Sequence, residues 1–190
     1  MIFGRPTRGR DQCSPRSLAY TWGSTADEQQ LPYPCDTHFA EAEEAYFRAI
    51  DVEAPAPVVF RWLCQLKAAP YSYDWIDNFG RRSPRRLSRG LEELELGQRF
   101  MGFFELVEFQ RDRHLTVLLK APGAMRWLGG IAASYVVTPR GGSASRLVVK
   151  LLVRYPAGPV GWATRWFLPW ADLVMMRKQL LTLKGLAEGP

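Results

Sequence analysis

The last stretch of the chain has the spacing of a long amphipathic helix. Between Gly158 and Glu188 apolar residues recur every three or four positions, the period of a helix with one buried face. The stripe expected to face the core consists of Trp162, Trp166, Trp170, Leu173, Val174, Leu180 and Leu181. Arg177 projects near the middle of this stripe, and Pro169 is expected to kink the helix axis. The pattern therefore predicts one long terminal helix packed against a sheet, with a charged residue in its apolar face.

The region before this helix alternates between apolar and polar positions, as strands do. One face of the segment from Ser145 to Tyr155 carries Leu147, Val149, Leu151, Val153 and Tyr155. The other face carries Lys150 and Arg154, so we expect an antiparallel sheet with one covered face and one wet face. Further strands are expected at residues 45–52, 114–120 and 131–138. Residues 99–104 and 105–109 are expected to form two consecutive strands or one bent strand, with Gly102 as a candidate bulge.

Two short helices are expected after the first strand. Pro55 and Pro57 can start a helix whose apolar side includes Trp62, and Pro70 bounds it. Ser72 can cap a second helix, which Gly80 closes. A strand, two short helices, a run of antiparallel strands and a long terminal helix indicate an α+β helix-grip fold, in which a curved sheet holds the last helix. Because a curved sheet and a helix seldom fill the space between them, we expect a cavity there.

The sequence divides into an N-terminal arm and one globular domain. Residues 1–40 are predicted to be a flexible arm, and residues 41–190 the helix-grip ligand-binding domain. Tyr20, Trp22 and the proline-stiffened segment Leu31–Pro34 are exceptions within the arm. This part is expected either to lie across the domain or a second subunit, or to remain a partly ordered tail.

Composition narrows the class of protein. The 190 residues are 47% hydrophobic, which suits a single domain with a sizeable core. The sequence has no long apolar run and no signal-peptide pattern, so a cytoplasmic location is expected. The three cysteines are odd in number and lack metal-type spacing, which favours reduced thiols. Neither a metal nor a cofactor is expected, since no phosphate-binding or dinucleotide pattern occurs.

Three segments also resemble a known family. They are YFRAIDVEAPAPVVFRWLCQL, PYSYDWIDN and PWADLVMMRKQLLTLKGLAE, within residues 45–188. Together with the order of elements they are similar to the SRPBCC (START/Bet v 1-like) superfamily, and within it to bacterial proteins described as polyketide cyclase/dehydrase or lipid-transport-like. The resemblance implies a helix-grip fold around a hydrophobic cavity that binds lipids, polyketides or other apolar molecules. Some relatives are aromatase/cyclases, and the superfamily supplies no universal catalytic motif.

Candidate ligand-binding residues therefore come from the chemistry of this sequence. They are Tyr71, Tyr73, Asp74, Trp75, Asp77, His114, Trp170 and Arg177. The aromatic and acidic group at residues 71–77 can line a cavity mouth and orient a ligand, or can simply pack and cap a short helix. His114 can act as an acid or base, or can lie exposed after a charged turn. Arg177 can bind a ligand anion, or can pair with a carboxylate or extend to solvent.

A basic loop is the other marked feature. It contains Arg81, Arg82, Arg85, Arg86 and Arg89, which supply most of the formal net charge of +6. The loop can be solvated, or can meet the headgroups of an anionic membrane surface. Nucleic acid is a less suitable partner, because neither an aromatic stacking surface nor a recognition helix accompanies the arginines.

The sequence favours a protein that binds a hydrophobic small molecule, lipid or polyketide-like, as a carrier or binding protein. The alternative is an aromatase/cyclase or dehydratase in the same cavity, with Arg177, Asp74, Tyr73 or His114 stabilising an enolate or moving protons. Whether the protein is an enzyme stays open at this point. An interaction module that uses the arginine loop is a third class.

Overall fold

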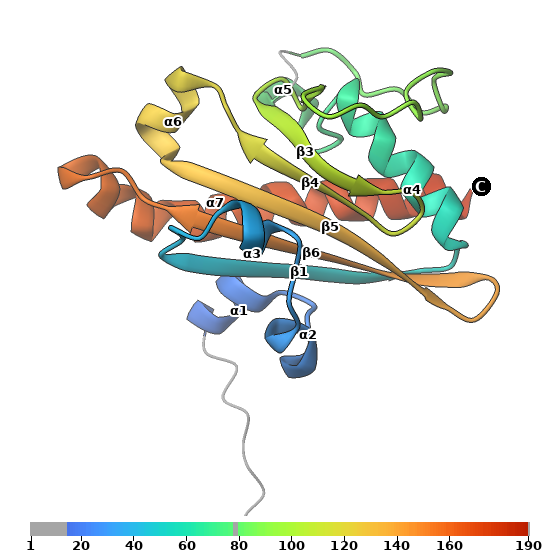
Figure 1. Cartoon of the computed structure of the whole chain (residues 1–190), viewed down its shortest axis with the longest axis horizontal. Coiled ribbons are helices and arrows are strands. Elements are labelled where there is room, and N and C mark those ends of the chain that lie inside the picture. Colours follow the sequence, from blue (N-terminus) through green and yellow to red (C-terminus); the bar gives the residue numbers. More distant parts are fainter. Residues whose placement is uncertain (1–14, 78–79, 190) are drawn as a thin grey trace, which may run out of the picture.

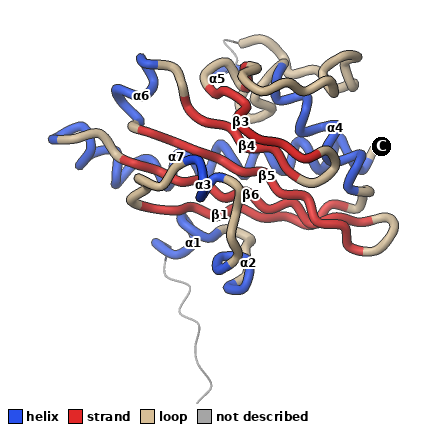
Figure 2. The backbone as a smooth tube through the Cα atoms, viewed as in Figure 1, coloured by secondary structure: helices blue, strands red, loops and turns tan. Residues whose placement is uncertain are grey.

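A single antiparallel sheet and one long helix make up the centre of the protein. The computed structural model describes residues 15–77 and 80–189. The sheet has six strands in the order β1-β6-β5-β4-β3-β2, and α7 runs along one face of it (Figures 1 and 2). The strands are β1 (Glu44–Val52), β2 (Arg99–Phe100), β3 (Phe104–Gln110), β4 (His114–Leu119), β5 (Gly130–Arg140) and β6 (Ala144–Arg154).

The helices surround this sheet. They are α1 (Pro15–Thr21), α2 (Ala26–Gln30), α3 (Cys35–His38), α4 (Ala56–Cys64), the 3-10 helix η1 (Gln65–Lys67), α5 (Asp74–Asp77), α6 (Pro122–Leu128) and α7 (Gly158–Glu188). The predicted strands and the terminal helix are therefore confirmed, and the architecture is an α+β helix-grip. Two local expectations were wrong. α6 occupies an expected loop, and the register shift lies between Leu106 and Glu108, while Gly102 (φ 76°) forms part of the β2–β3 turn.

The face of α7 that meets the sheet differs from the predicted stripe. Its buried residues are Gly161, Leu168, Pro169, Leu173, Met176, Gln179, Leu180 and Leu183. Trp162, Trp166, Trp170, Val174 and Leu181 are exposed instead. Apolar residues occur on two sides of this helix, and the true buried stripe includes glycine and glutamine. The spacing of hydrophobic residues alone therefore predicts the wrong face of α7 as the buried one.

The second face of the sheet is covered over its centre, while Arg154 at its end is exposed as expected. Tyr33 and Cys35, from the segment expected to be a flexible arm, pack with Phe47, Ala132 and Val148 in a cluster of buried residues. The ammonium group of Lys150 lies 2.6 Å from an oxygen of Asp36. It also lies 5.3 Å from the centre of the Tyr33 ring. Lys150 therefore anchors α3 to the sheet, and its alkyl stem shares the apolar layer.

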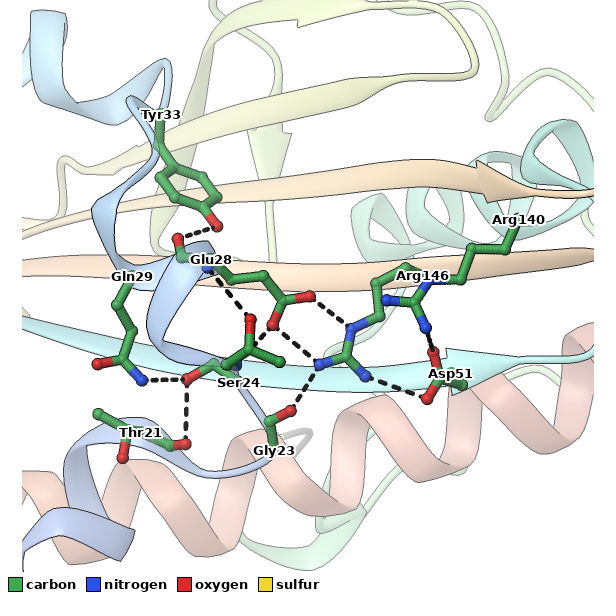
Figure 3. A network of polar contacts seen from close by, with 10 residues as sticks. Thr21, Gly23, Ser24, Glu28, Gln29, Tyr33, Asp51, Arg140 and Arg146 are labelled. Carbon is green, nitrogen blue, oxygen red and sulfur yellow. Dashed lines mark hydrogen bonds and ion pairs between the residues drawn. The ribbon is translucent and has the colours of Figure 1, made fainter. Parts of the chain in front are cut away.

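The rest of the N-terminal segment is held by a buried arginine on β6. Arg146 is bound by both carboxylate oxygens of Glu28, at 2.8 and 2.9 Å, and donates to the carbonyl of Gly23 (Figure 3). Gly23 has a φ of 75°, and a Cβ there would lie 2.1 Å from the carbonyl oxygen of Ala49. Beside it, the Ala49 amide of the edge strand β1 donates to the carbonyl of Trp22. Residues 18–40 thus cover a sheet edge and do not form the expected flexible arm, because paired charges and hydrogen bonds fix them. Residues 1–14 lie outside the described part of the chain.

A buried ion pair joins α7 to the sheet. Arg48 of β1 faces the helix, is fully buried, and places a guanidinium nitrogen 2.7 Å from an oxygen of Asp172. The same nitrogen donates to the carbonyls of Ala19 in α1 and Pro169 in α7, and the other terminal nitrogen donates to Phe47. Burial raises the pKa of Asp172 to about 6, although Arg48 opposes this shift. These carbonyl oxygens accept hydrogen bonds from the guanidinium group, which offsets part of the cost of burying its charge.

We expect Arg48→Met and Asp172→Asn each to lower the free energy of unfolding by about 3–5 kcal/mol, because each leaves the other partner buried without its counter-charge. The double variant should lose less than the sum of the two. Urea denaturation measures all three values. Arg61→Met is the matched control, because its ion pair with Glu92 is exposed and is worth about 1 kcal/mol or less. Strictly additive losses would show that the buried charges do not depend on each other.

Candidate ligand-binding site

A cavity of about 480 Å³ opens beside the C-terminal half of α7. Its walls come from the segment before α5, from α5 itself, from the arginine loop and from α7. The lining residues are Tyr71, Ser72, Asp74, Arg82, Ser83, Pro84, Arg85, Lys178, Thr182 and Leu186. None of these lining residues belongs to a strand, so this cavity lies at the edge of the helix-grip. Beneath the sheet, α7 instead packs Met176, Leu180 and Leu183 into the core.

Tyr71 forms the inner wall of the cavity and is held in a strained conformation. Its φ is 58°, in the left-handed region that residues with a side chain seldom occupy. The preceding carbonyl, of Pro70, accepts a hydrogen bond of 2.6 Å from Gln179, whose oxygen accepts another from the Tyr135 hydroxyl. The ring packs edge to face on Trp62, with 6.2 Å between ring centres. Strain persists where surrounding contacts fix the conformation, and Gln179 is therefore a positioning residue of this site.

The hydroxyl group of Tyr71 is buried and has no hydrogen-bond partner among the described residues. Burial, together with the Asp74 carboxylate, raises the pKa of Tyr71 to about 12. The hydroxyl therefore keeps its proton and can donate it to an acceptor. A buried polar group without a partner costs about 1–3 kcal/mol, and such an exception in a cavity wall indicates a group that a ligand can satisfy.

Asp74 anchors the arginine loop over the cavity. One carboxylate oxygen accepts the Ser83 hydroxyl at 2.5 Å, and the other accepts the Ser83 amide at 3.0 Å. These two bonds hold Ser83 at the cavity, and with it the neighbouring Arg82 and Arg85, which also line the cavity. The carboxylate thus fixes the loop, and each of its two oxygens already accepts one hydrogen bond.

Three cationic side chains meet at this cavity without a fixed counter-charge. Arg82, Arg85 and Lys178 line it, and within residues 15–77 and 80–189 none of them makes an ion pair or a side-chain hydrogen bond. The only carboxylate in the lining is that of Asp74, which Ser83 occupies. The cavity therefore has a positive potential and free N–H donors, the features that bind carboxylate, phosphate or sulfonate groups.

Of the residues selected from the sequence, the structure brings two into this cavity. Tyr71 and Asp74 line it, whereas Tyr73 is partly buried outside the lining and Trp75 is 76% exposed. Asp77 is the last residue of α5, and its side chain lies outside the described part of the structure. The aromatic and acidic group is therefore divided between a cavity wall and the surface of a short helix.

The other three candidates lie elsewhere. His114 is on the face of the sheet opposite α7, where its ring nitrogen is 3.1 Å from an oxygen of Glu108. Trp170 is 43% exposed on the outer side of α7. Arg177 is also exposed, and its guanidinium lies 5.8 Å from the centre of the Trp22 ring. Of the alternatives left open by the sequence, Arg177 extends to solvent, since the buried stripe of α7 runs along another side.

The structure adds residues that sequence reasoning did not select. Lys178, Thr182 and Leu186 line the cavity, and their four-residue spacing places them on one face of α7. A basic, a polar and an apolar residue in that order resemble an ordinary solvated face. In the sequence Arg82 and Arg85 are simply part of a basic loop, because nothing there indicates that Asp74 folds this loop back onto α7.

Among residues 15–77 and 80–189, no three His, Cys, Asp or Glu side chains come together as a metal site would require. In the same part of the chain, no helix has the length and apolar character needed to cross a bilayer.

Comparison with solved structures supports the fold. A Thermobifida fusca protein solved by NMR has a TM-score of 0.50 and 16% identity, over 75% of this chain and 92% of that one. The two chains share the helix-grip arrangement of a sheet and a long helix. The Zhui aromatase/cyclase from Streptomyces sp. R1128 has a TM-score of 0.47 and 17% identity, over 76% of this chain and 93% of that one. At these identities the similarity to solved structures shows a fold and not an activity. No protein-family model matches the sequence, and no curated protein is similar to it.

Asp74→Ala should loosen the arginine loop, because the variant removes both hydrogen bonds to Ser83. Each bond to a charged acceptor is worth about 1.5–3 kcal/mol, so local opening should become much more frequent. Limited trypsin digestion with mass spectrometry should find faster cleavage after Arg82, Arg85 and Arg86. Asp27→Ala, at an exposed position in α2, is the control and should leave the rate unchanged. Equal rates in the two variants would contradict the anchoring role of Asp74.

Proposed function

We propose that the protein binds an amphipathic small molecule that carries an anionic group, as a carrier or binding protein. The observation behind this proposal is one cavity whose lining combines three unpaired cations with Tyr71, a residue whose buried hydroxyl has no partner among the described residues. The anionic group would lie against Arg82, Arg85 and Lys178. The sequence predicts a hydrophobic ligand, and the cations that line the cavity favour a ligand that also carries a negative charge.

The chemistry of the lining supports an anion more than a neutral ligand. Guanidinium groups bind carboxylates and phosphates through two parallel N–H bonds, and such charge-assisted bonds are about twice as strong as neutral ones. When a ligand excludes water from the cavity, the attraction increases because the local dielectric falls. Arg82 and Arg85 come from one loop and Lys178 from α7, so an anion would also join these two elements.

The remaining lining suits the less polar part of such a ligand. Pro84, Leu186 and the ring of Tyr71 supply apolar surface, while the Tyr71 hydroxyl supplies one donor. A volume of about 480 Å³ falls within the range of small-molecule sites, roughly 300–1,000 Å³. A mainly apolar lining with a few fixed polar groups is the usual composition of such sites, although this one is more charged than most.

The arginine loop is the part of the site that also fits a membrane surface. Arg82 and Arg85 line the cavity, and we assign them to the ligand. Arg86 and Arg89 are exposed, and headgroup binding by this loop would rest mainly on them. The ligand assignment is preferred because the cavity combines loop cations with groups that a flat bilayer surface would not reach, above all Tyr71.

A cyclase or dehydratase is the second candidate function. Such an enzyme needs several polar groups that converge on the reacting atoms, and the residues Tyr71 and Lys178 both line this cavity. The hydroxyl and the cations can stabilise an enolate oxygen. A general base is the weaker part of this candidate, because the Asp74 carboxylate accepts two bonds from Ser83. Turnover of a poly-keto thioester that is lost in Tyr71→Phe would favour the enzyme over the carrier.

Replacing Arg82, Arg85 and Lys178 together by glutamine should weaken binding of the anionic apolar dye anilinonaphthalene sulfonate by about 10- to 100-fold, since charge-assisted bonds are lost. Binding of Nile red, a neutral apolar dye, should change by less than about threefold. Fluorescence titration measures both affinities.

Arg177→Gln is the matched control for this experiment. It removes one positive charge from the same helix outside the cavity lining, and both dyes should bind as they do to the unaltered protein. An equal loss for the two dyes in the triple variant would rule out anion recognition. A loss in Arg177→Gln as large as in the triple variant would mean that overall charge, and not this cavity, attracts the dye.

Tyr71→Phe should separate binding from stability. The variant removes a buried hydroxyl that has no partner, so the free energy of unfolding without ligand should stay constant or rise by about 1 kcal/mol. The affinity for anilinonaphthalene sulfonate should fall, because the ligand loses a donor. Urea denaturation and dye titration give the two values. A destabilised Tyr71→Phe with unchanged affinity would contradict the role of this hydroxyl.

A further inference from the structure

The opposite end of α7 carries a cluster of exposed aromatic side chains. Trp162 is 70% exposed, Trp166 is 62% exposed and Phe167 is 71% exposed, and Trp127 of α6 is 61% exposed. Val160, Trp170 and Met125 are also exposed in these two helices. We call this set of seven residues the aromatic tip. So many large apolar side chains at one end are unusual, because exposed apolar groups normally occur singly.

The aromatic tip projects from the body of the protein. Figure 1 shows the first turns of α7 extending beyond the sheet, with α6 at the same end. An open groove of about 530 Å³ lies between the two helices, lined by Trp127, Leu128, Pro159, Val160, Ala163, Thr164, Phe167 and Leu168. Thr164 is the one polar residue in this lining, and its hydroxyl is within hydrogen-bond distance of the carbonyls of Val160 and Trp127. The groove therefore offers a partner an apolar surface.

The charged residues of α6 and of the first turns of α7 are basic, while Glu41 and Glu43 of the neighbouring segment pair with Arg154 and Arg165. Residues 157–171, which include the first turns of α7, contain no aspartate or glutamate, and the same holds for residues 120–130 around α6. Lys120 and Arg126 are exposed, and among the described residues neither side chain has an ion-pair partner. Arg165 pairs with Glu43 and stacks on the ring of Tyr155. Aromatic residues, unpaired cations and the absence of acidic residues in these segments complement an anionic bilayer surface.

We propose that the aromatic tip docks the protein on the surface of a bilayer that contains anionic lipid. Indole rings favour the membrane–water interface, where the ring contacts acyl chains and the N–H group contacts water or headgroups. Four of the seven tip residues are tryptophans, a composition more typical of that interface than of a protein core. The groove between α6 and α7 can receive part of an acyl chain, while Lys120 and Arg126 meet lipid phosphates.

This docking surface is separate from the cation-lined cavity, which lies at the other end of α7. The proposal therefore does not depend on the proposed ligand site. It also differs from headgroup binding by the arginine loop, because apolar insertion should persist at salt concentrations that screen exposed charges.

Co-sedimentation with phosphatidylcholine vesicles, with and without phosphatidylglycerol, tests the proposal. The unaltered protein should bind more tightly when phosphatidylglycerol is present. Trp162→Ala combined with Phe167→Ala should weaken binding by about tenfold or more, because two inserted side chains are lost. Trp75→Ala is the matched control, since it removes an equally exposed tryptophan from α5, and should bind as the unaltered protein does.

A second pair of variants tests the charge requirement. Arg126→Glu should weaken binding to the anionic vesicles, whereas Arg111→Glu, in the β3–β4 turn away from the aromatic tip, should not. Absence of vesicle binding, or equal binding by the tip variant and the Trp75→Ala control, would overturn the proposal. Sedimentation velocity supplies the remaining decisive outcome. Self-association that the double tip variant abolishes, without vesicle binding, would make this surface a contact between two copies of the chain and would also overturn the proposal.

Discussion

The buried charge of Arg48 is the constraint on which the arrangement of the protein depends. A guanidinium group in a low-dielectric interior is stable only with a counter-charge and further acceptors in fixed places. Asp172 supplies the charge, and the carbonyls of Ala19 and Pro169 supply acceptors. One side chain on the edge strand thereby specifies the position of both α1 and α7. Apolar packing alone would allow a helix to slide or rotate on a sheet, whereas this pair allows one register.

Because α7 is fixed in that register, its two ends present different kinds of side chain. The C-terminal half presents Lys178 and Thr182 to a cavity, and the N-terminal half presents Trp162 and Phe167 to solvent. Trp162 and Thr182 are about 30 Å apart along the axis at the rise of an α-helix. The two surfaces therefore do not share side chains, and substitutions at one end leave the other intact. Pro169 lies between them and is buried next to the charge pair.

Much of the fold could be predicted from the sequence, and the site could be predicted only in part. The alternation in β6 and the helical period after Gly158 record local geometry, so the elements they predict were confirmed. The phase of α7 was wrong because its buried face includes Gly161 and Gln179, which a hydrophobicity pattern counts as surface residues. Their burial depends on distant partners, such as Tyr135 for Gln179. Of the cavity lining only Tyr71 and Asp74 were candidates, because the bonds from Ser83 to Asp74 that hold the arginine loop there leave no pattern in the sequence.

The pairing of β1 with β6 has a consequence for how the chain acquires its structure. Val52 and Ser145 begin a ladder that runs to Glu44 and Val153, so the first strand bonds to the last one made. During synthesis at about 5–20 residues per second, β1 would wait for several seconds before its partner leaves the ribosome. Throughout that interval an apolar strand with unpaired amides is open to wrong pairings, and non-local ladders of this kind form slowly. The N-terminal segment is synthesised before β1 and can occupy one side of it at once, through the bond between the Ala49 amide and the Trp22 carbonyl. In kinetic terms these first helices can shield a strand that has no partner yet.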